Sequence, residues 1–250
     1  MKKLAFCFLI YDLINHEELW NIFFKNVDPN KYSIYIHYKT NKKLKYFEKY
    51  KLNNCIETIY ADISLVKAQN LLLQEALNDE SNTNFIFVSG SCIPLKSFNH
   101  VYNFLEEAYS YFGLNPQTLC FPRCNNLLNF VKKEFIQKAG QWCILNRKHA
   151  KIMLESTDYL TWYKNIYAAD EHCYIINLYI NNLQNEIIDL FTTYRNWESK
   201  GKSPKNYETI IKEELLQLLN SNSLFGRKFD IKCNESLHIE KYINAISSTP

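Results

Sequence analysis

The chain is poor in glycine and proline, which account for only five and six of its 250 residues. It has no Gly-x-Gly-x-x-Gly segment and no Gly-x-x-x-x-Gly-Lys-Ser/Thr segment. These are the loops that bind dinucleotides and the phosphates of nucleoside triphosphates. It also lacks Gly-x-Ser-x-Gly, the turn that carries the nucleophile of α/β-hydrolases. The absences argue against a dinucleotide enzyme, a P-loop NTPase and a hydrolase of that fold.

Long apolar runs and a strong charge of one sign are absent as well. No segment approaches the ~18 apolar residues of a membrane span. The N-terminal MKKLAFCFLIYDL resembles a short signal peptide, but no small-residue cleavage site follows it. We therefore expect a soluble, cytoplasmic chain that begins with a buried strand. The net charge of +3 is too small to indicate nucleic-acid binding, although converging basic groups could bind a small anion.

Cysteine is plentiful, with eight residues, but a chain of this length does not need disulfides for stability. Cys7 and Cys143 lie in apolar runs, and we interpret such residues as buried thiols. Cys120 and Cys124 do not have zinc-site spacing and no second pair follows them. A disulfide between these two is the less favoured alternative.

Hydrophobic residues make up 47% of the chain, enough for a sizeable core. Its first half alternates strand patterns with helical periodicity. The expected elements are strands over 4–10, 32–38, 56–60 and 85–88, and helices over 15–24, 41–50, 64–78 and 97–112. This order predicts an α/β fold with a mainly parallel sheet and helices on both faces.

The second half is less regular. Its expected elements are strands near 118–121 and over 140–146, and helices over 147–156, 170–183 and 204–220. Asn15 and Glu18 predict a capping box at the first helix, and Ser203-Pro204 predicts the start of the last. Since no internal repeat or linker is visible, we expect one domain over residues 1–250.

A sheet of this kind binds ligands at the carboxyl ends of its strands. The segments that follow the predicted strands are Tyr11–Asn15, His37–Thr40, Ala61–Ser64 and Ser89–Pro94. Within them, Ser64, Ser89 and Gly90 are candidates for a ligand cleft.

Four segments combine polar or charged residues with apolar runs, and each has an ordinary structural interpretation when taken alone. Residues 89–95 would be a turn that ends a strand, and 140–149 a core strand that enters a helix. Asp170 and Glu171 would be acidic residues in a first helical turn, where the helix dipole stabilises them. The arginines of TTYRNW and LFGRKFD would be surface side chains beside aromatic rings.

Taken together and in order, the four segments resemble the signature of the core-2/I-branching enzymes, glycosyltransferase family 14, and in particular its plant branch. The matching segments are SGSCIPLKSF (89–98), GQWCILNRKHA (140–150), ADEHCYI (169–175) and LFGRKFDIKC (224–233). ADISLVKAQNLLLQEAL (61–77) also resembles the family's helix after its third strand. The resemblance covers nearly the whole chain, and the order of the motifs makes it more specific than any one of them.

The resemblance implies a GT-A-like fold and the transfer of a sugar, most often N-acetylglucosamine, from a UDP donor with inversion. It assigns the base that deprotonates the acceptor hydroxyl to Glu171, with Asp170 as a cap or a supporting residue. It assigns the donor diphosphate to Lys228 and Arg195, with Arg227 as a third candidate. Members of the family use such basic groups in place of a metal, and this chain has no Asp-x-Asp metal motif. We therefore expect no metal and no cofactor.

The resemblance also implies an acceptor that is a glycan or a glycoprotein. Gln141 and Trp142 match a segment on the acceptor side of the cleft, where Trp142 would either stack on a sugar or belong to the core. His37 stands in a region where animal members carry an acidic residue. Many relatives are Golgi proteins with a membrane anchor, whereas this chain begins at its first strand.

Other interpretations remain open from the sequence. The donor could carry xylose or glucose, and the chain could be a sugar-binding relative that has kept the fold without activity. A nucleic-acid binder would need lysine and arginine on one face. The only dense run, over 39–51, fits a solvated helix better.

Overall fold

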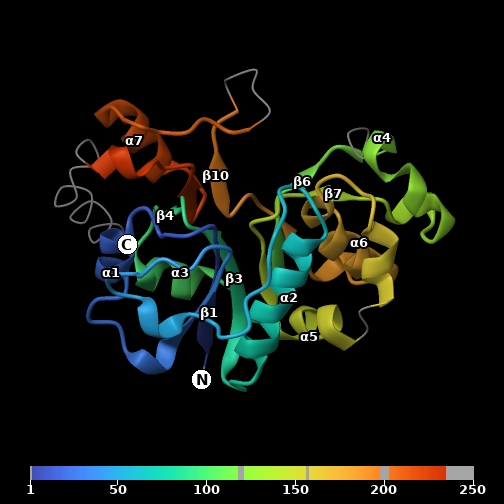
Figure 1. The fold of residues 1–250 in the computed structure, drawn as a ribbon, viewed down its shortest axis with the longest axis horizontal. Coiled ribbons are helices and arrows are strands. Elements are labelled where there is room, and N and C mark those ends of the chain that lie inside the picture. The colour runs from blue at the N-terminus through green and yellow to red at the C-terminus, as the bar shows by residue number, and fades with distance from the viewer. Residues whose placement is uncertain (1, 118–120, 156–157, 198–202, 235–250) are drawn as a thin grey trace.

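The computed structural model describes residues 2–117, 121–155, 158–197 and 203–234 (Figure 1). Its main sheet has six strands in the order β2-β1-β3-β8-β5-β9. They are β1 (Lys3–Ile10), β2 (Tyr32–Tyr38), β3 (Asn82–Ser89), β5 (Ser110–Phe112), β8 (Ile144–Asn146) and β9 (Ile187–Asp189). Only β8 runs against its neighbours in this sheet of described residues. The prediction of a mainly parallel sheet is confirmed.

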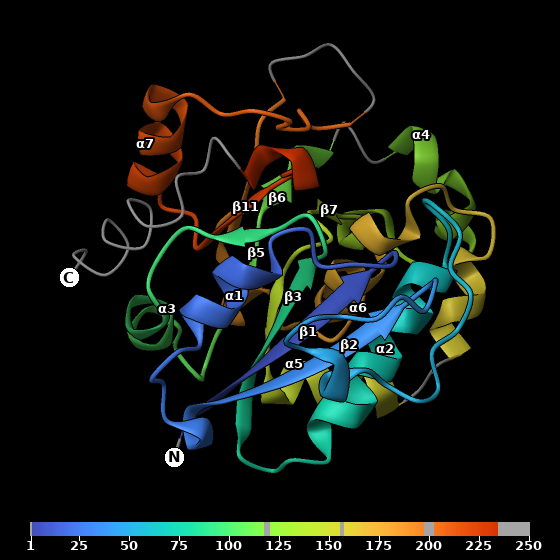
Figure 2. The same ribbon diagram turned by 60° about the vertical axis from the view of Figure 1, so that its left-hand side comes forward.

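Helices cover both faces of this sheet, as Figures 1 and 2 show. They are α1 (Glu17–Phe23), α2 (Ser64–Leu77), α3 (Phe98–Phe104), α5 (Arg147–Glu155) and α6 (Cys173–Ile180). Alternate residues of β1 point to opposite faces. Phe6 and Phe8 pack with α1 and α3, whereas Cys7 and Leu9 pack with α2, α5 and α6. The sheet thus separates two hydrophobic cores.

A second sheet extends from the carboxyl end of β3. Its order is β10-β11-β4, with β4 (Ile93–Pro94), β10 (Thr193–Arg195) and β11 (Phe225–Arg227). A third core lies between it and α7 (Lys212–Asn220), and includes Ile93, Leu218 and Phe229. β6 (Leu114–Asn115) pairs with β7 (Lys138–Ala139). The remaining short elements are α4 (Phe121–Cys124) and 3-10 turns at Pro29–Lys31, Glu48–Tyr50, Asn125–Asn129, Lys133–Phe135, Asp158–Tyr163, Ala169–Glu171, Gln184–Glu186 and Ile231–Asn234.

Two predicted elements of the first half are wrong. Residues 41–50 form no helix beyond the 3-10 turn at Glu48–Tyr50, because the carboxylate of Glu17 accepts hydrogen bonds from the backbone of Lys45 and Phe47, both at 2.9 Å. Residues 56–60 form no strand. The N–H of Ile56 donates to the imidazole of His37 at 3.0 Å, so this backbone bonds to a side chain in place of a neighbouring strand.

Helix starts were predicted with mixed success. The helix predicted over 97–112 starts as expected, and the hydroxyl of Ser97 caps α3 by accepting from the N–H of His100 at 3.2 Å. However, α3 ends at Phe104 and 110–112 is a strand. Asn15 makes no capping box, because its side-chain amide donates to the carbonyl of Phe229 at 2.8 Å. The last helix begins at Lys212, well after Ser203-Pro204.

The other elements of the second half were located closely. α5 lies over 147–155 and α6 within 170–183 as predicted, while the strand expected over 140–146 is confined to Ile144–Asn146. Of the strand expected near 118–121, residues 118–120 lie outside the described part, and Phe121 begins α4. None of the helices that the structure describes is long and apolar enough to cross a membrane.

Candidate active site

The acidic pair lies in a 3-10 turn at Ala169–Glu171, directly before α6. Ala168, which precedes the turn, has left-handed backbone angles (φ 56°, ψ 49°). Its N–H donates to the carbonyl of Ala61 at 2.7 Å, and the buried His172 ring contacts the carbonyl of Gln137 at 2.8 Å. Contacts on both sides of the turn therefore fix where Asp170 and Glu171 lie.

Glu171 is held by two cations that the sequence did not single out. Its Oε2 lies 3.0 Å from Nη1 of Arg123 and 3.2 Å from Nζ of Lys138. The carboxylate is partly exposed, so a hydroxyl of a bound molecule can approach it. Charge-assisted contacts of this length hold a carboxylate in a defined orientation.

Asp170 differs sharply from its neighbour. Its Oδ1 is buried and has no hydrogen-bond partner among the described residues, so the expected capping bond is not seen from this atom. Burial, reinforced by the charge of Glu171, raises the pKa of Asp170 to about 7. A carboxyl group with such a pKa is partly protonated at neutral pH.

Two arginines face this turn from the second sheet. Arg195 ends β10 and Arg227 ends β11, and the parallel register places the two residues opposite each other. Burial lowers the pKa of Arg195, while the charge of Glu171 acts in the opposite direction. Burial also lowers the pKa of Arg227, against the effects of Cys92 and Asp170. The structure therefore brings together the acidic and basic residues that the motifs indicated.

Aromatic rings support both guanidinium groups. Cζ of Arg227 lies 4.7 Å from the ring centroid of Trp142, and Cζ of Arg195 lies 4.9 Å from that of Phe191. Trp142 is only 8% exposed, which places it beneath Arg227 as part of the core and leaves little of its ring for a sugar. Nε of Arg227 is buried without a hydrogen-bond partner in the described residues, so a buried donor is available for an anion.

Lys228 follows β11 and is partly buried. Burial lowers its pKa, and the charge of Arg227 adds to this effect. Its carbonyl accepts a hydrogen bond from the N–H of Tyr207 at 2.8 Å, which fixes the backbone at this point. Lys228 is thus a third cation, after Arg195 and Arg227, at this edge of the second sheet.

Four further predicted residues serve the local structure. The hydroxyl of Ser64 accepts from the N–H of Ile59 at 2.9 Å and closes the turn before α2. Ser89 is buried, and its hydroxyl contacts Sγ of Cys92 at 3.1 Å. Gly90 is in tight contact with the chain after β1, because a Cβ there would lie 2.2 Å from the carbonyl oxygen of Leu13. The carbonyl of Gln141 accepts from the N–H of Cys143 at 3.1 Å.

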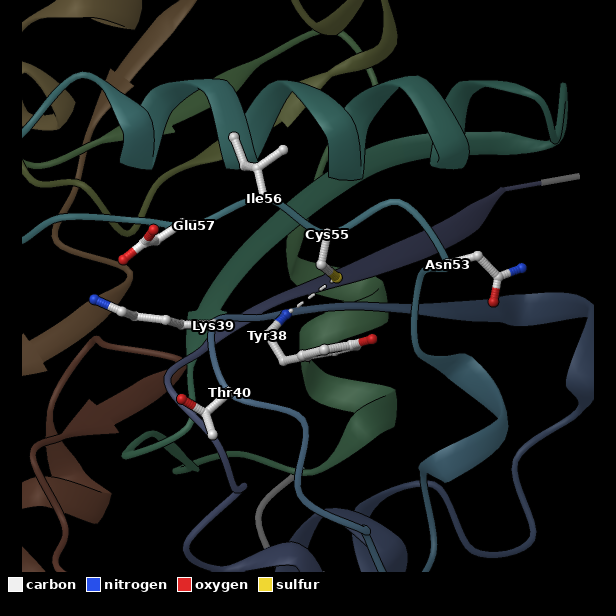
Figure 3. Close-up of a pocket in the computed structure, with 7 residues that line it drawn as sticks. All are labelled: Tyr38, Lys39, Thr40, Asn53, Cys55, Ile56 and Glu57. Carbon is white, nitrogen blue, oxygen red and sulfur yellow. Dashed lines mark hydrogen bonds between the residues drawn. The ribbon is translucent and has the colours of Figure 1, made fainter.

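A cavity of about 380 Å³ lies beside the carboxyl end of β2. Figure 3 shows its lining, formed by Tyr38, Lys39, Thr40, Asn53, Cys55, Ile56 and Glu57. Lys39 and Glu57 extend toward the same side in this view, and the ammonium of Lys39 donates to the carbonyl of Thr58 at 2.7 Å. His37 does not line this cavity: its buried ring binds Ile56 and so holds the cavity wall.

Metal ligands do not cluster in the part of the chain that the structure describes, where no group of three or more His, Cys, Asp and Glu residues could hold an ion. The charged groups around the acidic turn are instead mostly cationic, namely Arg123, Lys138 and Arg195 near Glu171 and Arg227 near Asp170. An anionic ligand suits this arrangement.

Comparison with known families agrees with the motifs. Residues 4–220 match the family described as "Branch: Core-2/I-Branching enzyme". The chain belongs to the core-2/I-branching enzyme family. The family membership predicted from the four motifs is thereby confirmed. The observed sheet agrees with the GT-A-like fold that this family implies.

A curated relative is a plant member of the core-2/I-branching enzymes. "Glycosyltransferase BC10" from Oryza sativa subsp. japonica is 28% identical over 166 residues, which are 63% of this chain and 42% of the rice protein. The match therefore spans less than half of that relative. Its name places sugar transfer among the activities of proteins similar to this chain.

Two solved structures are similar to the chain at low identity. One is the galactosyltransferase LgtC, with donor and acceptor sugar analogues (TM-score 0.48, 7% identity, 98% of this chain and 97% of that one). The other is the bifunctional glycosyltransferase WbbM in its apo form (TM-score 0.47, 10% identity, 99% of this chain and 50% of that one). At such TM-scores the likenesses say nothing of ligand or mechanism.

Arg123 and Lys138 are the main residues that the motifs missed. Lys138 stands two residues before the GQW segment, so a basic residue beside that motif was a usable signal. Arg123 lies in an irregular polar stretch, where no periodicity or spacing connects it to an acidic residue in another element. Only the folded chain shows that both contact Glu171.

Proposed function

We propose that this core-2/I-branching family chain is an inverting, metal-independent glycosyltransferase that moves a sugar from a UDP donor to a hydroxyl of a glycan or glycoprotein. N-acetylglucosamine is the favoured donor sugar by family resemblance. The observation that carries the proposal is the acidic turn at Asp170–Glu171 facing the arginines that end β10 and β11. Under this proposal, Glu171 is the base on one side of a reaction centre and the half-buried arginines are on the other.

Inversion requires one in-line displacement at the anomeric carbon. The acceptor oxygen forms a bond to that carbon while the bond between the carbon and the β-phosphate oxygen breaks, and UDP leaves with the electron pair. The proton of the acceptor hydroxyl passes to the carboxylate of Glu171. Arg123 and Lys138, both within 3.2 Å of Oε2, keep this carboxylate oriented toward the acceptor.

Departure of UDP places negative charge on the diphosphate. Arg195 and Arg227 are partly buried cations near the acidic turn, and Lys228 directly follows Arg227. Groups fixed before the reaction stabilise such charge more strongly than water does. By analogy with other charge-stabilising groups, a clamp of this kind contributes ~3–4 kcal/mol. We propose that these three residues perform the role that a divalent metal has in other sugar transferases.

The nucleoside is proposed to bind at the carboxyl ends of β1 and β2, where open α/β sheets bind their ligands. The cavity of about 380 Å³ beside Lys39 and Glu57 supports this placement (Figure 3). The same loop continues to Tyr60, whose interactions extend to Asp170 and Glu171. The loop after β2 thereby connects the proposed nucleoside site with the proposed reaction centre.

The decisive experiment measures UDP release from a panel of UDP-sugars in EDTA and then with added manganese. Wild type is expected to release UDP from one donor in EDTA, and Glu171→Gln is expected to lower the rate about 10²- to 10⁴-fold because the proton acceptor is lost. Glu186→Gln is the matched control, since Glu186 pairs with Lys148 and His149, away from the acidic turn.

Release that depends on manganese would contradict the metal-free mechanism. An unchanged rate for Glu171→Gln would remove the base assignment. Donor binding without any release, in the presence or absence of acceptor glycans, would support a sugar-binding relative over an enzyme.

A further inference from the structure

Two of the five glycines, Gly113 and Gly140, meet where β6 pairs with β7. The N–H of Gly140 donates to the carbonyl of Gly113 at 3.0 Å. A side chain packs closely against each glycine. A Cβ on Gly113 would lie 2.2 Å from Cδ1 of Phe191, and a Cβ on Gly140 would lie 3.2 Å from Nη2 of Arg195. The absence of both Cβ atoms therefore makes room for a ring and a guanidinium.

The guanidinium of Arg195 presents its flat face to Gly140. A Cβ on Gly140 would lie 3.2, 3.4 and 3.5 Å from Nη2, Cζ and Nη1, and similar distances to three atoms of one plane indicate contact with its face. Cζ also lies 4.9 Å from the ring centroid of Phe191, within the range of a cation–π interaction. The N–H groups of a guanidinium lie in its plane, so contacts with the face leave these donors available.

The chain around Phe191 is fixed to its neighbours by hydrogen bonds. The N–H of Leu190 donates to the carbonyl of Phe112 at 2.9 Å, and the N–H of Leu114 donates to Oδ1 of Asp189 at 2.8 Å. These bonds hold the chain after β9 against the start of β6. The backbone thereby positions the ring of Phe191, although 39% of this residue is exposed.

Arg227 rests on an aromatic ring in a similar way, with Cζ 4.7 Å from the ring centroid of Trp142. The described residues provide neither Arg227 nor Arg195 with an ion pair. A ring stabilises a cation without using its N–H donors. Since Trp142 stands two residues after Gly140, the GQW segment contacts both arginines.

We propose that Gly140 and Phe191 are positioning residues of the donor site, which hold the guanidinium of Arg195 with its N–H edge toward the donor diphosphate. This inference rests on the proposed function for the identity of that anion. A side chain that is fixed before the ligand arrives loses less entropy on binding. Gly140 then serves the donor side, whereas family resemblance assigned Gln141 and Trp142 to the acceptor side.

The test compares the Kd of UDP with that of uridine, which carries no phosphate, in EDTA. Isothermal titration calorimetry measures the first, and saturation-transfer NMR of the uracil protons measures the second. Phe191→Leu is expected to weaken UDP binding about fivefold and to leave uridine binding unchanged, and Phe191→Tyr to keep the wild-type Kd because a ring remains. Phe104→Leu is the matched control, since Phe104 is also 39% exposed but belongs to α3.

Gly140→Ala tests the other contact of Arg195. Its Cβ would displace the guanidinium, so we expect the same selective loss of UDP affinity as for Phe191→Leu. Uridine binding in the same samples reports whether each variant is folded. An unchanged Kd for UDP in both variants, or equal losses for UDP and uridine, would overturn the inference.

A double substitution separates positioning from a direct contact of the ring with UDP. In an Arg195→Gln background, Phe191→Leu is expected to change the Kd of UDP by less than about twofold, because the group that the ring positions is gone. The full loss in that background would overturn the inference, and so would a wild-type protein that binds UDP no more tightly than uridine. Failure of the proposed function would appear separately, as absence of UDP release from every donor while UDP binding still depends on Phe191.

Discussion

Two side chains of the candidate site have buried polar atoms to which no described residue forms a hydrogen bond. Asp170 has a buried Oδ1 with no hydrogen-bond partner in the described residues, and Arg227 has a buried Nε in the same condition. Buried polar atoms without partners reduce stability. Such atoms are expected where a site binds a ligand, which agrees with the proposed function.

Asp170 gives the stability of the chain a definite pH dependence. Its pKa of about 7 exceeds the 3.8 of a free carboxyl, so the stability that its protonated form provides at low pH is lost as the pH rises through 7. The loss amounts to about 4 kcal/mol when complete. Asp170→Asn is therefore expected to be more stable than wild type at pH 8 and to show little advantage at pH 4. Denaturant unfolding at several pH values measures this, and parallel curves would refute it.

His37 acts in the opposite direction. Burial lowers the pKa of His37 to about 4, and the neutral ring accepts a hydrogen bond from the N–H of Ile56. Stability present above pH 6.5 is therefore lost as the pH falls toward 4, by about 3 kcal/mol in total. His37→Gln keeps an acceptor but does not titrate there. We expect it to be less stable than wild type at pH 7.5 and to close that gap at pH 4.5 in the same unfolding measurement. A constant gap would argue against this assignment.

At the scale of elements, the contact between the ends of β1 and β3 depends on one glycine. A Cβ on Gly90 would meet the backbone carbonyl of Leu13 at 2.2 Å, and the N–H of Asn15 donates to the carbonyl of Gly90 at 2.8 Å. Gly90→Ala is expected to separate these segments and to lower the free energy of unfolding by about 1–3 kcal/mol.

Gly140→Ala is the matched control for this prediction. Its Cβ would meet the guanidinium of Arg195 at 3.2 Å, and the end of a flexible side chain can move where a backbone carbonyl cannot. Thermal unfolding of both variants should show the larger decrease for Gly90→Ala. Equal decreases would show that the close approach to Leu13 is not the cause.

Elements were predictable from the sequence where their own residues carry the pattern. The apolar run of β1, the alternation in β2 and the periodicity of α2 indicate structures that lie within one or two residues of the predicted bounds. Residues 41–50 and 56–60 could not be assigned correctly in this way. Their backbone groups bond to Glu17 and His37, and no local pattern shows that such distant side chains will be near.

The residues of the candidate site were likewise predictable only where they belong to a sequence motif. The motifs indicated Asp170, Glu171, Arg195 and Arg227, which the structure brings together. They did not indicate Arg123, whose contact with Glu171 joins α4 to a turn near α6. The position of Ser64 and Ser89 after predicted strands made both candidates for the cleft, but hydrogen bonds within the chain engage both hydroxyls.

At the scale of the whole molecule, the two sheets explain how distant segments meet. β4 begins shortly after β3 ends, and the N–H of Leu95 donates to the carbonyl of Leu224 at 2.8 Å. This pairing brings β11 to the carboxyl edge of the main sheet, so that Arg227 lies near Cys92. The acidic turn before α6 reaches the same edge through its bond to Ala61. One end of the main sheet thereby collects the charged groups of both halves of the chain.

The register that sets Arg195 opposite Arg227 also has a consequence in terms of mass action. Two like charges held close together lower the stability of the ligand-free protein. An anion that binds only the native state shifts the folding equilibrium toward that state. A ligand at a hundred times its Kd adds about 2.7 kcal/mol to the stability. The concentration of free nucleotide donor would then govern, besides the rate of turnover, how much of the chain is folded at any moment.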